Sequence, residues 1–297
     1  ISQLPDVGRV NTNALQETRR SQIQSILNRS NARLVRDARD SGGPRAQFRV
    51  ECGGTTESLV RFARFEGIPY DRPEDCIRGI ERDVFDCAWR ELRQETFYAG
   101  DAGSKKYVIF LEICCAPPYA NAEGDLGGAA CGQGWGTDDH NRLNNPNNGT
   151  RTQLAVVYVN GGGLGAGAVP VDEQPLEISP PDCMTSTVMM HEAGHTMGAV
   201  QPGAPDYAGD GGNGDGTGPV GHCSAAAGLD VMCPPAHRFP SGTTISARSD
   251  CATVAEATRP LIRFDCNFNT YFDTQSNTSW LMNTWNLGEG NQYLEFG

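Results

Sequence analysis

The sequence has no long apolar run, little positive charge and no pair of cysteines at zinc-finger spacing. No apolar stretch approaches the roughly eighteen residues that a membrane-spanning helix needs, so we expect no membrane partner. The 24 lysines and arginines face 36 aspartates and glutamates, which gives a net charge of −12. Because clustered positive charge is what holds a phosphate backbone, we expect no nucleic-acid partner either.

Cysteine, in contrast, is abundant. Eleven cysteines without a C-x-x-C pair are typical of proteins whose thiols form disulfides in an oxidising compartment, so we predict a secreted, extracellular protein. Because the number is odd, at least one cysteine is free, modified or paired outside the chain. No charged and apolar leader precedes Ile1, so we expect the sequence to begin after a processing cut.

Hydrophobic periodicity predicts four helices. The first runs from Asn13 to about Asp40 and is ended by Ser-Gly-Gly-Pro. We expect a second helix over 55–67 and a third from near Pro73 to about Leu92. The fourth begins at about Pro181 and extends to Val200, and it contains the most informative motif of the chain.

Three segments predict strands, because they are rich in β-branched and aromatic residues and are bounded by turn formers. They cover residues 46–52, 105–115 and 154–160. Residues 116–150 are rich in Gly, Asn, Pro and Asp, which favours a long functional loop or a disulfide-pinned connection. We therefore predict an α/β (α+β) fold with an N-terminal lobe over 1–200 and a smaller, loop-rich, disulfide-stabilised lobe over 201–297.

The motif His-Glu-Ala-Gly-His, residues 191–195, predicts a metal site on the fourth helix. Side chains four residues apart project from one face of a helix, so His191 and His195 can bind the same ion. Glu192, about 100° further round the helix, is placed to act on a water as general base without being a ligand. Surface histidines at this spacing without a metal are the alternative, but the helix is apolar on several sides, as suits a buried catalytic helix.

The third metal ligand is less evident from the sequence. Gly198 is the glycine of the extended HExxHxxGxxH zinc signature, but Gln201 stands at the expected ligand position, and a neutral amide is a weak zinc ligand. We favour His222, because a disulfide at Cys223 could fix its backbone. The alternatives stay open. They are Asp206 and Gln201 and, more remotely, His140 and His237.

Met232, in the segment Leu-Asp-Val-Met-Cys, provides a second landmark. A methionine on a tight turn forms an apolar floor beneath the metal in metzincin peptidases. Taken alone, Met232 is better interpreted as an ordinary core methionine. In combination with the His-Glu-Ala-Gly-His motif, we interpret it as the methionine of such a turn.

Together, HEAGHTMGAVQPGAP, GHC, DVMC, FDCNFNTYF and WLMNTWNLGEGNQYL resemble a family of secreted, bacterial-type metzincin-like zinc metallopeptidases. The stretches CGQGWGTDDHNRLNN and SGGPRAQFRVEC are also similar, so the resemblance covers nearly the whole chain. It implies a twisted mixed sheet with backing helices and an irregular lower lobe that carries the methionine turn. It further implies that His191, His195 and His222 bind zinc, that Glu192 is the general base and that Met232 is the turn methionine.

The sequence departs from the wider pattern at two positions. Gln201 stands where many relatives have a ligand, and Pro234 stands where a tyrosine is common after the turn methionine. Two runs, 206–218 and 264–273, also combine Asp and Asn with short spacing, so calcium is a further candidate cofactor. Neither run matches an EF-hand loop.

These features predict a zinc endopeptidase that hydrolyses protein or peptide substrates through a water on the metal, with Glu192 as base. We expect one catalytic Zn²⁺ per chain and a monomer. One alternative is a non-catalytic binding or structural protein that retains zinc on the same scaffold. Another is a metal-dependent amidase of small molecules, which would have an enclosed pocket.

Overall fold

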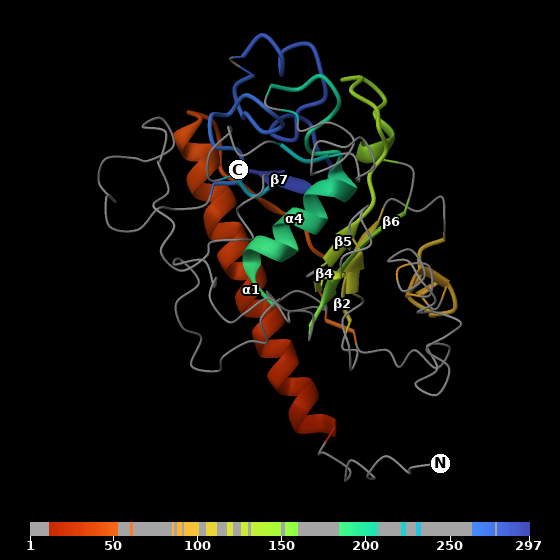
Figure 1. Cartoon of the computed structure of the whole chain (residues 1–297). Coiled ribbons are helices and arrows are strands. Elements are labelled where there is room, and N and C mark those ends of the chain that lie inside the picture. Colours follow the sequence, from red (N-terminus) through yellow and green to blue (C-terminus); the bar gives the residue numbers. More distant parts are fainter. Residues whose placement is uncertain are drawn as a thin grey trace.

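The structure, a computed structural model, describes part of the 297-residue chain. It describes residues 12–52, 60–61, 85, 88–90, 92–100, 105–111, 118–120, 126–129, 132–149, 152–159, 184–205, 207, 221–223, 230–232, 263–276 and 278–297, and no side chains in 12–15, 118–120 or 126–129. Within these residues the fold is mixed α/β, with helices and small sheets (Figure 1). The described part contains no helix that is long and apolar enough to cross a membrane.

Helix α1, Thr12–Asp40, confirms the first predicted helix and is the longest element described. Ile26, Leu27 and Leu34 are buried along one side of it. Two residues after the end of the helix, Gly42 has a φ of 87° in the left-handed region, a conformation that glycine adopts without steric cost. The helix therefore ends at the Ser-Gly-Gly-Pro sequence, as predicted.

A three-stranded mixed sheet forms the centre of the fold. Strands β2, Lys106–Leu111, and β6, Gln153–Tyr158, pair in parallel, and β5, Gly132–Gly134, pairs antiparallel to β6. The order is β2-β6-β5. This arrangement confirms the two strongest predicted strands.

Two two-stranded sheets accompany the central sheet. Strand β1, Ala46–Phe48, pairs antiparallel with β7, Leu294–Phe296, close to the C-terminus. Strands β3, Pro118–Ala120, and β4, Leu126–Ala129, pair with each other. Strands β3 to β5 and the 3₁₀ turn η1, Pro146–Asn148, lie in the segment predicted as a long loop, where glycine-rich strands with low β propensity give no clear signal.

The predicted second helix, 55–67, lies almost entirely outside the described residues. The third is described in part, because Phe85, residues 88–90 and Leu92 are helical. Ala88 and Leu92 are both buried, as expected for one face of that helix. They pack with Leu154, Val156 and Tyr158 of β6, which face the same side of the sheet.

Helix α4, Ser186–Met197, covers the other side of the sheet and lies between it and α1 (Figure 1). It begins later than the predicted start near Pro181, because the Thr185 side chain caps it by accepting a hydrogen bond from the Val188 N–H at 3.1 Å. It ends at Gly198, which has a φ of 79°. All twelve residues of α4 are buried, so this helix runs through the core.

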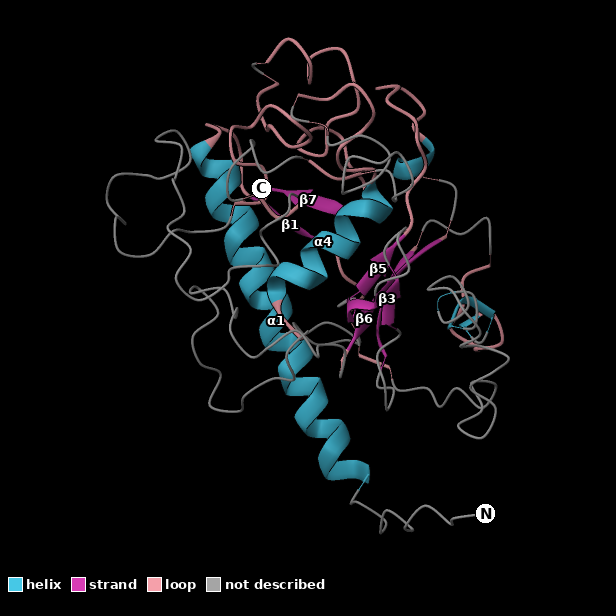
Figure 2. Cartoon of the chain, in the orientation of Figure 1, coloured by secondary structure: helices cyan, strands magenta, loops and turns pink. Residues whose placement is uncertain are grey.

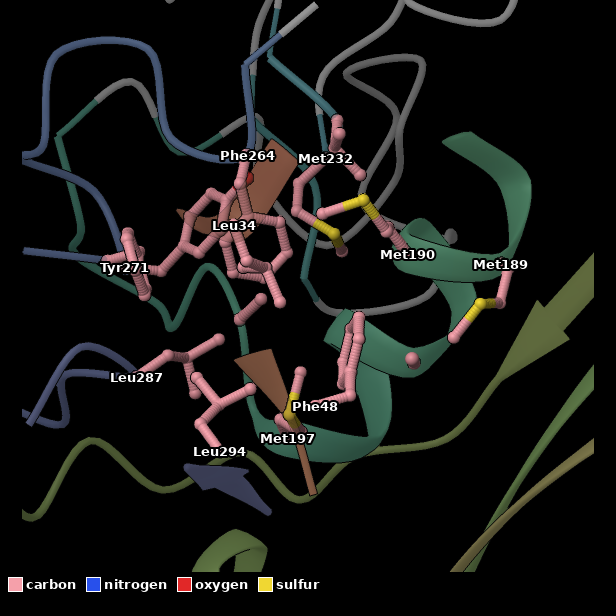
Figure 3. Close-up of a cluster of buried hydrophobic side chains, with 14 of the residues drawn as sticks. Leu34, Phe48, Met189, Met190, Met197, Met232, Phe264, Tyr271, Leu287 and Leu294 are labelled. Atoms are coloured by element: carbon pink, nitrogen blue, oxygen red, sulfur yellow. The ribbon is translucent and has the colours of Figure 1, made fainter. Parts of the chain in front are cut away.

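The main core joins residues from both predicted lobes. Figure 3 shows Met189, Met190 and Met197 of α4 with Met232 and Phe264 from the later loops. Loops dominate the described C-terminal part (Figure 2), as predicted for the region after Pro202. The division at residue 200 stays a prediction, and the core and the pairing of β1 with β7 both extend across it.

Candidate metal centre

Three histidine rings converge beside helix α4. His191 and His195 lie one helical turn apart on α4, and His222 comes from the loop at 221–223. The Nε2 atom of His191 lies 3.1 Å from Nε2 of His195 and 3.1 Å from Nε2 of His222. One candidate ligand atom from each of the three residues lies within 4.8 Å of the other two. The structure thus brings together the three histidines that the sequence selects.

The spacing of these nitrogens fits a zinc ion. In a tetrahedral site with Zn–N bonds of about 2.0 to 2.1 Å, two ligating nitrogens are about 3.3 Å apart. The two separations of 3.1 Å are close to that value. Imidazole nitrogens suit zinc among several transition metals, so this residue set can hold a metal with an open position for a further ligand.

The hydrogen bond on the far side of the His191 ring fixes its tautomer. Its Nδ1 lies 2.8 Å from the carbonyl oxygen of Val231. A carbonyl can only accept, so Nδ1 carries the proton and Nε2 presents its lone pair toward the other two rings. Such an outer partner orients a metal-binding histidine and raises its basicity.

The loop that carries His222 approaches α4 closely because of Gly221. This residue has a φ of 109°, and a Cβ atom on it would lie 2.7 Å from Nδ1 of His195. The next residue but one, Cys223, is disulfide-bonded, as predicted, and its N–H donates to the carbonyl of Met232 at 3.2 Å. The loop is therefore held directly after His222.

Met232 lies in a turn beneath the histidine-bearing part of α4. Its side chain is completely buried. A Cβ atom on Gly194, the residue before His195, would lie 2.7 Å from the Met232 sulfur. Glycine at position 194 therefore allows the methionine to contact the helix backbone directly, and the role of Met232 as a floor beneath a metal stays a prediction.

Glu192 packs against strand β5. Its side chain is 6% exposed. A Cβ atom on Gly132 would lie 2.6 Å from Cγ and 2.7 Å from Oε1 of Glu192. The absence of a side chain at Gly132 is thus what makes room for the carboxylate.

The two glycines of β5 and Gly136, two residues after the strand, are not among the residues singled out from the sequence. Gly134 and Gly136 also lie against α4, since their Cβ atoms would come within 2.3 Å of the Glu192 carbonyl oxygen and 2.0 Å of the His195 carbonyl oxygen. The signal was available as Gly-x-Gly-x-Gly over 132–136, because alternate residues of a strand face one side. A glycine in a strand often marks the close approach of another backbone.

The other candidate ligands lie elsewhere or are not described. Gln201 is buried, but its amide oxygen accepts from the Asp139 N–H at 2.8 Å and its amide nitrogen donates to the Gly198 carbonyl at 2.9 Å. His140 is exposed, with its ring 6.4 Å from that of Trp280. Asp206, His237 and Pro234 fall outside the described residues.

The run 264–273 uses its carboxylates for backbone contacts. Asp265 is fully buried and accepts hydrogen bonds from the N–H groups of Asn269, Thr270, Tyr271 and Phe272. In the part of the chain that is described, the three histidines are the only cluster of His, Cys, Asp or Glu that could hold a metal. Calcium therefore has no support at 264–273, and the run 206–218 is almost entirely outside the described residues.

Two ionisable groups with shifted pKa values lie near α4, the half-buried Lys106 and the fully buried Asp230. Burial lowers the pKa of Lys106 to about 7, although its ammonium contacts the carbonyl of Thr196 near the end of α4 and lies 4.5 Å from the centre of the Tyr293 ring. Burial, with Asp265 nearby, raises the pKa of Asp230 well above its usual range. Asp230 belongs to the turn that carries Met232.

Comparison of the chain with models of protein families, with curated proteins and with solved structures finds no match. The site is therefore characterised by its own residues. These are three histidines at ligand spacing, a buried glutamate and a buried methionine against the helix.

Proposed function

We propose that the chain is a secreted zinc-dependent endopeptidase with a metzincin-like fold, in which Glu192 is the general base. The observation that carries this proposal is the convergence of His191, His195 and His222 next to a buried Glu192 on the same helix. The disulfide bonds of Cys223 and Cys266 support an oxidising compartment.

In this proposal, His191, His195 and His222 hold one Zn²⁺. Zinc bound there would act as a Lewis acid toward a carbonyl group and would lower the pKa of a water molecule to about 7. Glu192 would take the proton of that water and pass it to the leaving amine. Burial against β5 keeps the Glu192 side chain in one place, and the Val231 carbonyl keeps His191 in the tautomer that a metal requires.

A peptide substrate is supported by the position of β5. In the described part of the central sheet, β5 is an edge strand, and it lies directly against Glu192 through Gly132. An extended peptide can add to the edge of a sheet through main-chain hydrogen bonds. A substrate paired with this strand would run past the base, which favours a peptidase over an amidase of small molecules.

The test is digestion of casein by the purified protein, with zinc measured on the same sample. We expect cleavage that a chelator abolishes and that Glu192→Ala reduces by about 10²-fold or more, while zinc stays near one per chain. Glu295→Ala, at an exposed glutamate of β7, is the matched control and should cut normally. A wild-type protein that binds zinc but cuts no protein or peptide would instead indicate a binding or structural role.

A further inference from the structure

Asp230 is a buried carboxylate in the turn beneath the metal centre. It has no exposed surface, and among the described residues three groups, all of them donors, form hydrogen bonds to its side chain. Its Oδ1 accepts from the Met232 N–H at 2.8 Å and from the Tyr271 hydroxyl at 2.5 Å, and its Oδ2 accepts from the Cys266 N–H at 3.2 Å. A carboxylate that receives three donors and has no basic partner among these contacts is costly to bury.

One peptide group connects this carboxylate to the histidine cluster. The Met232 N–H that Asp230 binds and the Val231 carbonyl that His191 binds belong to the same peptide unit. A peptide unit is planar and conjugated, so a hydrogen-bond acceptor on its N–H increases the negative charge on its oxygen. Hydrogen bonds in such a chain strengthen one another.

Tyr271 forms the outer end of this series of hydrogen bonds, and its own position is fixed. It is 1% exposed, its N–H donates to Asp265 at 2.7 Å, and its ring packs edge-on against Phe264 with the ring centres 5.2 Å apart. The hydroxyl is therefore fixed toward Asp230. On the other side of the turn, the Val231 N–H donates to the Arg263 carbonyl at 2.8 Å, so the turn is held from both sides.

We propose that Asp230 and Tyr271 are positioning residues of the metal centre, which act on His191 through the peptide group between Val231 and Met232. A carboxylate bound directly to a ligating histidine is a common arrangement in zinc sites. Here the carboxylate is one peptide group away, and the turn that contains it also carries Met232. This inference rests on the proposed metal-binding role of His191.

The test compares zinc affinity, by competition with a chelator, in the full chain and in variants. Asp230→Asn keeps an acceptor for the Met232 N–H but replaces the oxygen that accepts from the Cys266 N–H with a donor, and we expect it to weaken zinc binding by about 10- to 100-fold, as for other outer partners of zinc ligands. Tyr271→Phe removes one hydrogen bond and should weaken binding by less. Tyr107→Phe is the matched control, because the Tyr107 hydroxyl contacts only the backbone of Phe97 and Ala99 among the described residues, and its ring packs on the core cluster on the other side of the central sheet.

A second readout separates positioning from general destabilisation. The proton on Nδ1 of His191 gives an NMR signal whose downfield shift reports the strength of its hydrogen bond to Val231. We expect this signal to move upfield in Asp230→Asn and Tyr271→Phe and to stay unchanged in Tyr107→Phe. Because Tyr271→Phe is nearly isosteric, it preserves the test if Asp230→Asn does not fold.

The outcomes distinguish this inference from the proposed function. If folded Asp230→Asn and Tyr271→Phe bind zinc as tightly as the wild type, the positioning role is wrong while the metal site stands. An equal loss in Tyr107→Phe would also overturn it, because the effect would then be general. A wild-type protein that binds no zinc would overturn the inference and the proposed function together.

Discussion

His191 divides its two ring nitrogens between two contacts. Nδ1 donates to Val231, and Nε2 faces the corresponding atoms of His195 and His222 at 3.1 Å. Each ring contributes one nitrogen toward the same point. The third histidine, His222, comes from a separate loop. The zinc affinity of the proposed site should therefore depend on the position of that loop as much as on the helix.

Replacement of His222 tests this dependence. We expect His222→Ala to weaken zinc binding by more than roughly a hundredfold, beyond the loss typical of an outer partner, because a ligand is removed. His140→Ala, at an exposed histidine, is the control and should leave affinity unchanged. Chelator competition measures both, and a His222→Ala protein with wild-type zinc affinity would contradict the ligand assignment.

The residues of this site differ in how readily their roles can be predicted from the sequence. The spacing of His191 and His195 follows from helix periodicity alone, and His222 was one of several candidates. Asp230 and Tyr271 could not be predicted, because their contact joins residues 41 positions apart and depends on how the loops fold. Sequence periodicity reports the neighbours within an element, but it carries no information on such long-range pairs.

At the scale of elements, the contact between β5 and α4 determines the position of Glu192. Alternate glycines of the strand allow two backbones to approach more closely than any side chain would permit. These glycines also explain why β5 was predicted as loop, since glycine disfavours strands. The strand forms because it pairs with β6 and packs on α4, which are tertiary contacts.

Gly132→Ala tests this packing. Its Cβ would lie 2.6 Å from both Cγ of Glu192 and the Val156 carbonyl oxygen, so the carboxylate must move. We expect casein cleavage to fall by about tenfold or more, within the range that a general base contributes, with zinc content unchanged. At Gly149 the nearest atom to an added Cβ would be 3.6 Å away. Gly149→Ala should therefore cleave casein as fast as the wild type. Equal activity of the two variants would show that Glu192 does not depend on β5.

Lys106 connects β2 with the end of α4 and predicts a pH dependence. Its pKa is about 7 in the folded chain and about 10.4 in an unfolded one. Below pH 7 Lys106 is protonated in both the folded and the unfolded chain, so the folded chain bears the full cost of burying the charge. Between about pH 7 and 10.4 only the unfolded chain keeps the proton, so the free energy of unfolding rises with pH, by at most about 1.4 kcal/mol per unit.

Denaturant unfolding of Lys106→Met and the wild type over this pH range measures the effect. We expect the stability of the wild type to increase relative to Lys106→Met as the pH rises from 7 to 10. Lys105→Met, at an exposed lysine, is the matched control and should show a smaller change. A difference between wild type and Lys106→Met that stays constant with pH would contradict the low pKa.

At the scale of the whole molecule, buried contacts bring the distant parts of the chain together. Asp37 of α1 accepts from the Arg263 side chain at 2.9 Å and from the Phe264 N–H at 2.6 Å, and both of its oxygens are therefore used. Strand β1 pairs with β7 at the end of the chain. The sequence predicted an α/β part and a loop-rich part but not these connections, because β7 has three residues and Asp37 looks like an ordinary helix residue.

Metal binding should stabilise the whole chain, because the three histidines belong to α4 and to a separate loop. A ligand that binds only the folded state adds about 2.7 kcal/mol at one hundred times its dissociation constant. We expect excess zinc to raise the melting temperature of metal-free protein and a chelator to reverse the increase. In His222→Ala the increase should be much smaller, and an equal increase in both proteins would indicate that zinc binds elsewhere.

The central claim is that three histidines bind one zinc ion. An anomalous difference map, recorded at the zinc absorption edge from crystals of the purified protein, tests it most directly. We predict a single peak bonded to the Nε2 atoms of His191, His195 and His222 at about 2.0 to 2.1 Å, with Glu192 close by but not bonded to it. No peak in crystals supplied with zinc, or a peak bound by other residues, would contradict this account.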